Sequence, residues 1–557
     1  MSENLSYLSG RKGVDSNLFE KMVQAAEGNG TPEDTKLKKL AEEFLMGSSV
    51  TLGASSFYDF LNEENLGKKA YVCSGSVCMV AGTQDKVTSE LKKCFSEEEI
   101  GKMCCLGRCH ENAAFNVNGE NFSGKAIDNL KEIVEKKNIS GEDDYSVKTN
   151  MSEPILTAEP LSLDRVKKII ESVIAKTPDD FLNEIKASKL RGRGGAGFPM
   201  GFKLDSCKSS PSDQKYIVCN ADEGDPGAYS DRYLLEKQPL LVLIGMVLSG
   251  YVVGADTGVL YIRAEYPESI DVIGKTIEDL EKAGLLGKSI LGSDFNFKFK
   301  IIKGAGAYIC GEETALLSSI EGQRPEVRVR PPYPTVEGLF NKPTVVNNVE
   351  TFASLPWISE NSGDAFSKIG TEKSTGTKLV SLDSCFNNGG IFEIEMGTPL
   401  GDIFEKFGEG HNKPVKAYHI GGPLGGLVPS QKVKDLTLDY ESFAEQNFLL
   451  GHASVLSLPT AYPVVEYLKH LFEFTADESC GKCFPCRLGS TRGAEMLEKA
   501  SKENVKIDRE LMDDLLETLE IGSLCALGGG LPLAINNALA YFGEELEPYF
   551  TQPASAL

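Results

Sequence analysis

The stretch RGRGGAGFPMGFK, residues 191–203, places Gly192, Gly194 and Gly197 at the spacing G-x-G-x-x-G. That spacing is typical of Rossmann dinucleotide-binding folds, where the loop follows a strand, opens a helix and precedes an acidic residue by about 20 positions. Here residues 165–190 have a helical pattern, and phenylalanine, proline and lysine follow the glycines. The context is therefore not that of a Rossmann loop. Glycines still let a phosphate approach the backbone, and Arg193 and Lys203 add positive charge.

Four cysteines towards the C-terminus form the strongest metal pattern in the sequence. Cys480, Cys483 and Cys486 have the spacing C-x-x-C-x-x-C, and Cys525 follows at a distance. Four soft thiolates suit a [4Fe–4S] cluster or zinc. The three-plus-one spacing favours [4Fe–4S], because zinc sites more often pair two C-x-x-C units.

A second set combines Cys73 and Cys78 with Cys105 and Cys109. Two pairs in the loops of a small α/β unit suit a [2Fe–2S] cluster, with zinc as the alternative. Cys104 is adjacent and is an alternative ligand, although the spacing C-L-G-R-C favours Cys105. The isolated cysteines, which we expect to be small buried apolar residues, are Cys94, Cys207, Cys219, Cys310 and Cys385.

Three further segments place polar residues in turns. They are NADEGDPGAY (residues 220–229), GAGAYICGEETAL (304–316) and NKPTVVNNVET (341–351). Taken singly, each is ordinary turn and capping chemistry. Their occurrence together, beside two cysteine sets, indicates a ligand site at the ends of strands in an α/β fold.

Five motifs, RGRGGAGFP, CNADEGDPG, GAGAYICGEETAL, KPTVVNNVET and ESCGKCFPCR, resemble the NADH-binding flavoprotein subunit of respiratory complex I and its relatives in NAD-linked hydrogenases and formate dehydrogenases. The resemblance covers about residues 186–527. The segment CSGSVC…CLGRC resembles the thioredoxin-like [2Fe–2S] subunit of the same complexes, here fused into one chain. Such a fusion is more usual in the hydrogenase and formate dehydrogenase relatives.

The resemblance implies FMN, NAD(H), one [4Fe–4S] and one [2Fe–2S] cluster as cofactors. FMN and nucleotide are expected to share a modified Rossmann-like fold. No side chain is expected to act as a proton donor or acceptor, because the hydride passes between cofactors. The residues expected to contact FMN by carry-over are Gly192, Arg193, Gly194, Lys203, Asn220, Asp222, Asp225, Tyr308, Gly311, Glu312, Asn347, Asn348 and Thr351.

For the nucleotide, the resemblance implies that Phe198 and Tyr333 stack on the adenine. Glu313 is expected to accept hydrogen bonds from the adenosine ribose, which favours NAD over NADP because a carboxylate repels a 2′-phosphate. Ser206 stands where some relatives carry a third stacking aromatic residue. Asp225 stands beside the flavin and nicotinamide, where complex I subunits usually carry glutamate.

The expected fold class is α/β multidomain. The predicted parts are a helical N-terminal segment (residues 1–66), a thioredoxin-like [2Fe–2S] domain (67–137), a linker (138–159), an FMN/NAD-binding α/β domain (160–355), a small β-rich, ubiquitin-like SLBB domain (356–430), and a helical bundle that carries the [4Fe–4S] site (431–557).

The composition and the termini argue against several other classes of protein. The chain has 557 residues with a formal charge of −23, which disfavours binding to nucleic acid or anionic lipid. The N-terminus has no apolar signal-peptide core, and the longest apolar run, residues 239–255, is expected to be a buried helix. We expect a cytoplasmic chain without membrane insertion, whose 14 cysteines are kept reduced.

The function that the resemblance implies is that of an NADH-oxidising or NAD-reducing diaphorase subunit of a multi-subunit oxidoreductase. The fusion and Asp225 favour a hydrogenase or formate dehydrogenase partner. The alternatives are a flavin-based bifurcating subunit that couples NAD to ferredoxin, and an electron-carrying scaffold without nucleotide turnover. The first alternative is weakened because the chain ends at Leu557 without further ferredoxin-like cysteines.

Overall fold

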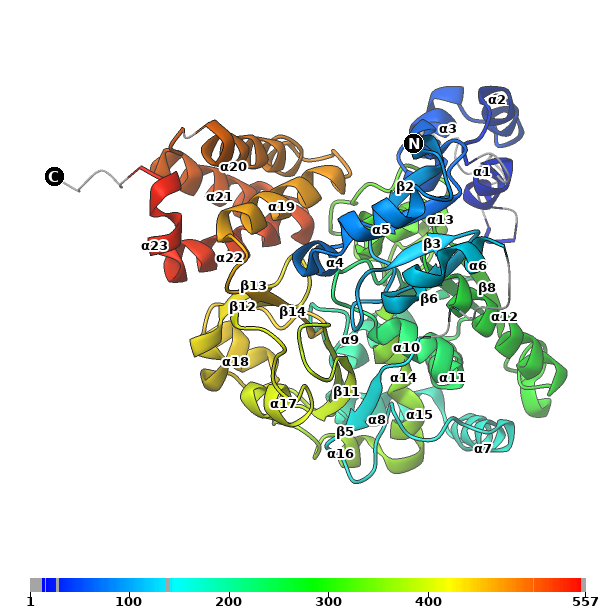
Figure 1. Cartoon of the computed structure of the whole chain (residues 1–557). Helices are drawn as coiled ribbons and strands as arrows, with labels where there is room; N and C mark the ends of the chain where they lie inside the picture. The colour runs from blue at the N-terminus through cyan, green and yellow to red at the C-terminus, as the bar shows by residue number, and fades with distance from the viewer. Residues whose placement is uncertain are drawn as a thin grey trace.

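The computed structural model describes residues 13–15, 17–26, 30–135, 141, 143–503 and 505–551. The remaining parts of the predicted N-terminal segment, [2Fe–2S] domain, linker and bundle lie outside the described residues. Within the described residues, the strands form three sheets, and helices follow the last sheet towards the C-terminus (Figure 1).

A parallel four-stranded sheet organises the middle of the chain. Its strands are β6 (Tyr216–Ala221), β7 (Thr257–Ile262), β8 (Lys298–Lys303) and β9 (Thr344–Asn348), in the order β8-β7-β6-β9. All six residues of β7 are buried, as expected for a parallel strand covered on both faces. Asn220 and Asn348 are paired at the carboxyl ends of β6 and β9, so the residues that follow these strands meet at one edge.

One face of this sheet packs on α11 (Pro239–Val253), the apolar run predicted to be a buried helix, and this prediction is confirmed. Helices α9 (Met200–Ser209) and α14 (Val349–Ala353) pack beside it. In the described residues no single helix is long and apolar enough to span a membrane. The pair α10 (Ser230–Lys237) and α11 meets that test only jointly, by length and composition, and is bent by 93°.

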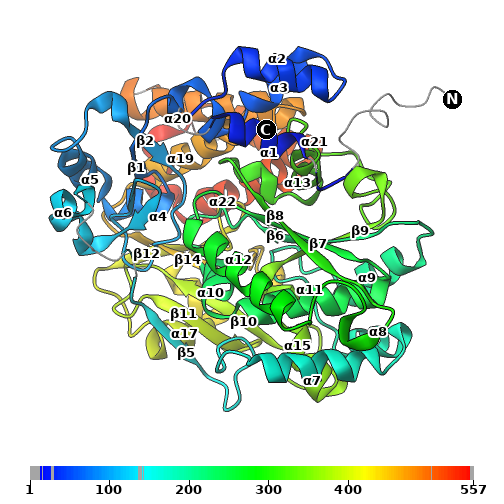
Figure 2. The ribbon, with the colours of Figure 1, turned by 90° about the vertical axis from the view of Figure 1, so that its right-hand side faces the viewer.

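The opposite face is covered by α13 (Glu313–Ile320) and by the N-terminal helices α1 (Leu18–Ala26), α2 (Asp34–Glu43) and α3 (Ser48–Ser55) (Figure 2). Phe19 of α1 stacks on Tyr261 of β7 at 6.3 Å between ring centroids. The Tyr58 hydroxyl donates to Ser319 Oγ in α13 at 2.7 Å. The N-terminal segment, in which the sequence showed no motif, therefore completes the core of the central sheet.

A small domain follows the N-terminal helices in the chain. It has the strands β1 (Ala70–Cys73), β2 (Ile100–Met103), β3 (Phe115–Val117) and β4 (Glu120–Phe122) in the order β2-β1-β3-β4. Strands β1 and β2 are parallel, and β3 is antiparallel to β1. Helices α4 (Ser76–Ala81), α5 (Gln84–Leu91) and α6 (Leu130–Val134) complete it.

The third sheet requires two corrections to the predicted boundaries. Its strands are β5 (Ser146–Thr149), β10 (Thr377–Leu382), β11 (Gly390–Glu395), β12 (Val415–Ile420), β13 (Gly426–Pro429) and β14 (Ser454–Pro459), in the order β13-β12-β14-β10-β11-β5. Strand β14 lies inside the predicted helical bundle. All six of its residues are buried, so it lacks the alternation that marks a half-exposed strand. Strand β5 lies inside the predicted linker and forms the sheet edge by pairing with β11.

Glu393 of β11 explains why the predicted linker is ordered there. Its buried carboxylate accepts hydrogen bonds from the backbone N–H groups of residues 155–157, at 2.8–3.0 Å, and from the Thr157 and Thr377 hydroxyls. Five hydrogen bonds satisfy the charge and fix the segment against the sheet.

The C-terminal helices therefore begin after β14 and not at residue 431. They are α19 (Val464–Asp477), α20 (Ser490–Glu503), α21 (Arg509–Gly522) and α22 (Ala526–Tyr541). Helix α19 packs on α20 and α22, and α21 packs on α22. Figure 1 shows this group at one end of the molecule, next to β12 and β13.

A buried ion pair joins the third sheet to the central domain. Lys378 of β10 and Glu350 of α14 are fully buried and in contact, and the other Glu350 oxygen accepts from the Leu379 N–H at 3.0 Å. Removing one partner of such a pair leaves an uncompensated buried charge, which costs about 3–5 kcal/mol.

We therefore expect Lys378→Met to lower the melting temperature by on the order of 10 °C, measured by thermal unfolding of the purified chain. The double variant Lys378→Met/Glu350→Gln should melt at a higher temperature than Lys378→Met alone, because no charge is left buried. Equal melting temperatures of the two variants would contradict the view that an uncompensated buried charge destabilises the contact between β10 and α14.

Candidate functional site

The four cysteines predicted to hold a [4Fe–4S] cluster come together where α19 ends and α22 begins. Cys480 and Cys486 are buried and Cys483 and Cys525 half-buried, and all four belong to one packed group. Cys486 lies in a π-helical turn (Pro485–Gly489), and Cys525 directly precedes α22. Burial, with nearby Cys483 and Cys480, raises the pKa of Cys486 to about 11, so a metal must displace the thiol proton.

Small residues allow α22 to approach this turn. A Cβ atom on Gly528 would lie 2.7 Å from Cys486 Cβ and 2.5 Å from Ser523 Oγ, closer than real contacts allow. On the adjacent Gly529, the nearest atom to such a Cβ would be 3.5 Å away, an ordinary contact. Ser479 Oγ also lies 3.3 Å from Cys486 Sγ.

The second cysteine set lies at the carboxyl end of β1, in α4 and in the loop after β2. Cys73, Cys78, Cys105 and Cys109 are all buried, and Cys105 Sγ lies 3.4 Å from Cys109 Sγ. Backbone N–H groups point at the sulfurs: Gly107 donates to Cys105 at 3.4 Å and Gly227 to Cys109 at 3.3 Å. Such N–H···S contacts are those that a thiolate-bound iron–sulfur cluster uses.

Cys104 and Cys105 differ in their contacts. Cys104 packs both against the group around Cys480 and against the group that contains the second cysteine set, whereas the Cys105 sulfur lies next to that of Cys109. This arrangement supports Cys105 as the fourth thiol of the second set. As placed, no three His, Cys, Asp or Glu side chains of the described residues are close enough to hold a single metal ion.

The glycine loop runs between the central domain and the third sheet. The Arg193 N–H donates to Thr351 Oγ1 at 2.9 Å, and a Cβ on Gly194 would lie 2.9 Å from Asn348 Cβ. The Arg193 guanidinium is buried and donates to the Thr375 carbonyl, while its Nε and Nη1 have no partner in the described residues. The structure thus brings the loop against the ends of β6 and β9, and it leaves buried donors suited to an anion.

The strand ends carry unpaired polar atoms that fit a flavin. Asn220 Nδ2 donates to the Gly311 carbonyl at 2.7 Å, which joins the turns after β6 and β8. Asp222 Oδ2 and Asn347 Nδ2 are buried and have no partner in the described residues. Burial raises the pKa of Asp222 to about 8. Each unpaired atom costs about 1–3 kcal/mol, and FMN, if bound here, would supply complementary amide and hydroxyl groups.

Other residues predicted to contact FMN already have protein partners. Glu312 Oε2 accepts from the N–H groups of Thr314 and Ala315 at 2.8 and 2.9 Å, and so caps α13. Asn348 caps α14 and donates to Asp231 at 2.7 Å. These side chains position the helices around the site, and their contact with FMN stays a prediction.

Glu313, predicted to select NAD, is held between two cations. Lys203 Nζ lies 3.0 Å from one of its carboxylate oxygens, and Arg330 Nη1 lies 3.1 Å from the other. Lys203 also donates to the Val346 carbonyl at 3.0 Å. Neutralising Glu313 would therefore expose two cations to a nucleotide phosphate.

Three exposed aromatic rings line this side of the loop. Phe198 is 45% exposed and Tyr333 57%, as suits rings that stack on a ligand. Phe202, which the sequence reasoning missed, is 64% exposed and lies 5.6 Å from Phe198 between ring centroids. The F-x-x-x-F spacing at the start of α9 was a signal for it. Ser206, on the same helix, instead donates to Thr335 at 2.8 Å.

Asp225 lies between two side chains from distant segments. The Tyr308 hydroxyl donates to Asp225 Oδ1, and His452 Nε2 lies 2.5 Å from Asp225 Oδ2. The Tyr308 ring packs on Phe474 at 5.0 Å, within the group that contains Cys480. Tyr308 was predicted to lie here, whereas no motif pointed to His452.

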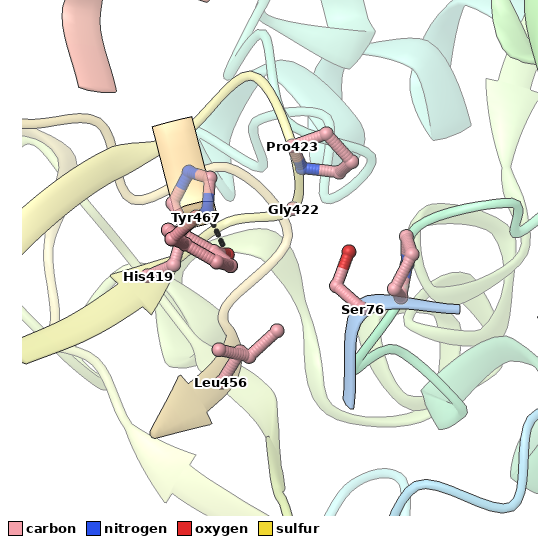
Figure 3. Close-up of a pocket in the computed structure, with 7 residues that line it drawn as sticks. Ser76, His419, Gly422, Pro423, Leu456 and Tyr467 are labelled. Carbon is pink, nitrogen blue, oxygen red and sulfur yellow. Dashed lines mark hydrogen bonds between the residues drawn. The ribbon is translucent and has the colours of Figure 1, made fainter. Parts of the chain in front are cut away.

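A small pocket lies between α4, the third sheet and α19 (Figure 3). His419 and Tyr467 line it and are hydrogen-bonded at 2.7 Å, and Ser76 lies on the opposite wall. Ser76 Oγ is 2.8 Å from His470 Nε2. Burial lowers the pKa of His419 and of His470 to about 4, so both rings are neutral at pH 7.

Three family models match the chain. They are the Nuo51 FMN-binding domain over residues 185–357, the NADH-ubiquinone oxidoreductase-F iron–sulfur binding region over residues 466–549, and the thioredoxin-like [2Fe–2S] ferredoxin over residues 7–138. The third match spans both the N-terminal helices and the small domain.

Several curated proteins are similar to the chain. The NADP-reducing hydrogenase subunit HndC of Solidesulfovibrio fructosivorans is 42% identical over 68% of this chain and 78% of that protein. The NAD-reducing hydrogenase HoxS subunit alpha of Cupriavidus necator is 32% identical over 88% of this chain and 85% of that protein. An NADH-quinone oxidoreductase subunit of Escherichia coli is 36% identical over 72% of this chain and 92% of that protein. A crystal structure of an NAD+-reducing [NiFe]-hydrogenase, air-oxidized, matches with a TM-score of 0.84 and 27% identity, covering 97% of this chain and 94% of that one.

The approach of α22 to Cys486 generates a prediction with a matched control. Gly528→Ala should reduce the iron and acid-labile sulfide recovered per chain by about half or more, because the new methyl group displaces Cys486 or Ser523. Gly529→Ala, in the same helix turn, should retain the parent content. Full retention in Gly528→Ala, measured after anaerobic purification, would argue against a cluster at this place.

Proposed function

Because this chain belongs to the family of NADH-binding flavoprotein subunits of complex I and of NAD-reducing hydrogenases, we propose that it is the diaphorase subunit of a multi-subunit oxidoreductase. In this role it exchanges a hydride with NAD(H) and passes single electrons to partner subunits. FMN, when bound, supplies the conversion between a two-electron hydride and single electrons, and the iron–sulfur clusters supply one-electron carriers.

The observation that carries this proposal is the contact of one flavin-site edge with both cysteine sets. The turn after β6 contains Asp222 and Asp225, and its Gly227 N–H donates to Cys109 Sγ at 3.3 Å. Tyr308, which donates to Asp225, packs on Phe474 in the group around Cys480. The two sets and the polar strand ends thus lie close to one another, as short-range electron transfer between them would need.

The chain's own residues divide the work of binding. Gly192, Gly194 and Lys203 are proposed to hold the phosphate side of FMN, and Asn220, Asp222 and Asn347 the polar edges of the ring and ribityl chain. The unpartnered atoms of Asp222 and Asn347 support this assignment. Phe198, Phe202 and Tyr333 are proposed to stack on the adenine, which their exposure supports.

The finer assignments are also proposals. The sheet of β10–β14, with β5 added at its edge, is proposed to be the ubiquitin-like SLBB domain. A hydrogenase is the first candidate partner, because HndC and HoxS are hydrogenase subunits. A formate dehydrogenase partner or coupling to ferredoxin is the alternative, which co-purification decides. A reducing, cytoplasmic location agrees with cysteines that are all free.

The direct test is anaerobic purification followed by addition of NADH. We expect FMN, one [4Fe–4S] and one [2Fe–2S] per chain, and bleaching of the visible absorbance by NADH. Cys486→Ser and Cys73→Ser should each remove one cluster by iron analysis and EPR, whereas Cys385→Ser, at an isolated buried cysteine, should remove none. A chain that binds FMN but is not reduced by NADH would support the scaffold alternative instead.

Glu313 provides a separate test of nucleotide choice. Glu313→Gln should raise kcat/KM for NADPH relative to NADH by about tenfold, equivalent to ~1.4 kcal/mol, because Arg330 then faces the 2′-phosphate without a competing carboxylate. Glu337→Gln, at an exposed glutamate near Tyr333, should leave the ratio unchanged. An unchanged ratio in Glu313→Gln would place selection elsewhere.

A further inference from the structure

We propose that His452 is a positioning residue that pairs with Asp225 and sets the charge of the site beside the flavin. This inference rests on the proposed function, because it concerns the ring-facing side of the same site. It adds a residue that belongs to none of the motifs of the chain and that comes from the third sheet rather than from the FMN domain.

The backbone holds His452 at the seam between the two domains. It lies immediately before β14, between Gly451 and Ala453, whose φ angles are +57° and +65°. Gly451 packs against Gly421, and a Cβ on Gly195 of the glycine loop would lie 3.9 Å from it. The turn therefore carries the imidazole to the edge where the glycine loop and the turn after β6 meet.

Asp225 is fixed from three sides. Its two oxygens face the Tyr308 hydroxyl and His452 Nε2 respectively. On the third side, a Cβ on Gly422 would lie 2.4 Å from Asp225 Cγ, so only glycine fits there. The carboxylate consequently has little freedom to turn away from these partners.

The pair has features that a purely structural pair would lack. Both ring nitrogens of His452 are buried and lack a hydrogen-bond partner in the described residues, although Nε2 lies 2.5 Å from Asp225 Oδ2, and Asp222 Oδ2 on the neighbouring carboxylate is unpaired as well. A pair kept only for stability is expected to have its polar atoms satisfied. The unpaired atoms indicate that the surroundings of Asp225 are completed by a bound group.

The other charged groups near His452 are already committed. The Glu223 carboxylate accepts from Ser230 Oγ and from the backbone N–H groups of residues 231 and 232. Lys378 is paired with Glu350. Next to Tyr308, the other partner of Asp225, the Glu478 carboxylate accepts a hydrogen bond from the Tyr308 backbone N–H at 2.8 Å. Among the described residues, Asp225 is therefore the carboxylate in contact with His452.

The charge of the pair depends on pH. Burial lowers the pKa of His452, but Asp225, with Glu223 at longer range, raises it by more, so that it lies above its ordinary value. Below that pKa the pair is neutral, and above it the pair carries one negative charge. A negative charge beside the flavin disfavours the addition of electrons, so the flavin midpoint potential should fall additionally as pH rises through this pKa.

The test is the midpoint potential of FMN in the full chain, measured by spectroelectrochemistry at low and high pH. In His452→Gln no imidazolium faces Asp225 at either pH. We expect the variant's potential to lie below the parent's at pH 6 and to converge with it at high pH. His411→Gln, a control whose ring contacts Tyr418 in the third sheet, should match the parent at both pH values.

A double variant separates positioning from loss of fold. In an Asp225→Asn background, His452→Gln should cause no further change of potential, whereas an additional effect of similar size would overturn the pairing. An equal offset of His452→Gln at low and high pH would also overturn it.

The proposed function fails in a distinguishable way, through a chain that binds no FMN or is not bleached by NADH. A histidine NMR titration of the full chain without added FMN tests the pair itself. The His452 signal, assigned through His452→Gln, should titrate at a lower pH in Asp225→Asn than in the parent. An unchanged titration would overturn the pairing irrespective of flavin.

Discussion

The docking of the small domain on the central domain depends on one carboxylate, which lies between two buried guanidinium groups. Asp143 Oδ1 lies 2.7 Å from Arg108 Nη1, in the loop of the small domain, and 2.6 Å from Arg232 Nη2, in α10 of the central domain. Arg232 also donates to the Gly107 carbonyl at 2.7 Å. Both arginines are 2% exposed, so neither charge is tolerated without its partner. The network therefore forms only when the second cysteine loop is docked on the central domain.

The same principle operates at the other seams of the chain. Glu393 fixes the segment after the small domain to β11, and Lys378 with Glu350 joins β10 to α14. Each charged group is buried, and each is compensated by a residue or backbone group of a different part of the chain. Buried charge pairs thus fix the parts of the chain relative to one another more closely than apolar packing alone does.

The sequence predicted those features whose residues lie close together in the chain, and missed those that depend on contacts between distant residues. The two cysteine sets are read from spacing, because the cysteines of each motif are close together in the sequence. The fold is needed to bring Cys525 to its motif and to join the pair Cys73 and Cys78 to the pair Cys105 and Cys109. The apolar run of α11 is equally direct. By contrast, β14 is buried throughout and shows no alternation, and β5 is a short polar edge strand whose order depends on Glu393 far along the chain. His452 has no motif, since it meets Asp225 only through the folding of two domains.

The small domain that carries the second cysteine set is held at both of its ends. Helices α1–α3, which precede it, are built into the core of the central sheet, and β5, which follows it, is an edge strand of the third sheet. Within the described residues, anchors on both sides oppose a swinging motion of the domain. The cluster proposed at its four cysteines is therefore expected to keep a constant distance from the proposed flavin edge. That arrangement suits a fixed relay better than a carrier that moves.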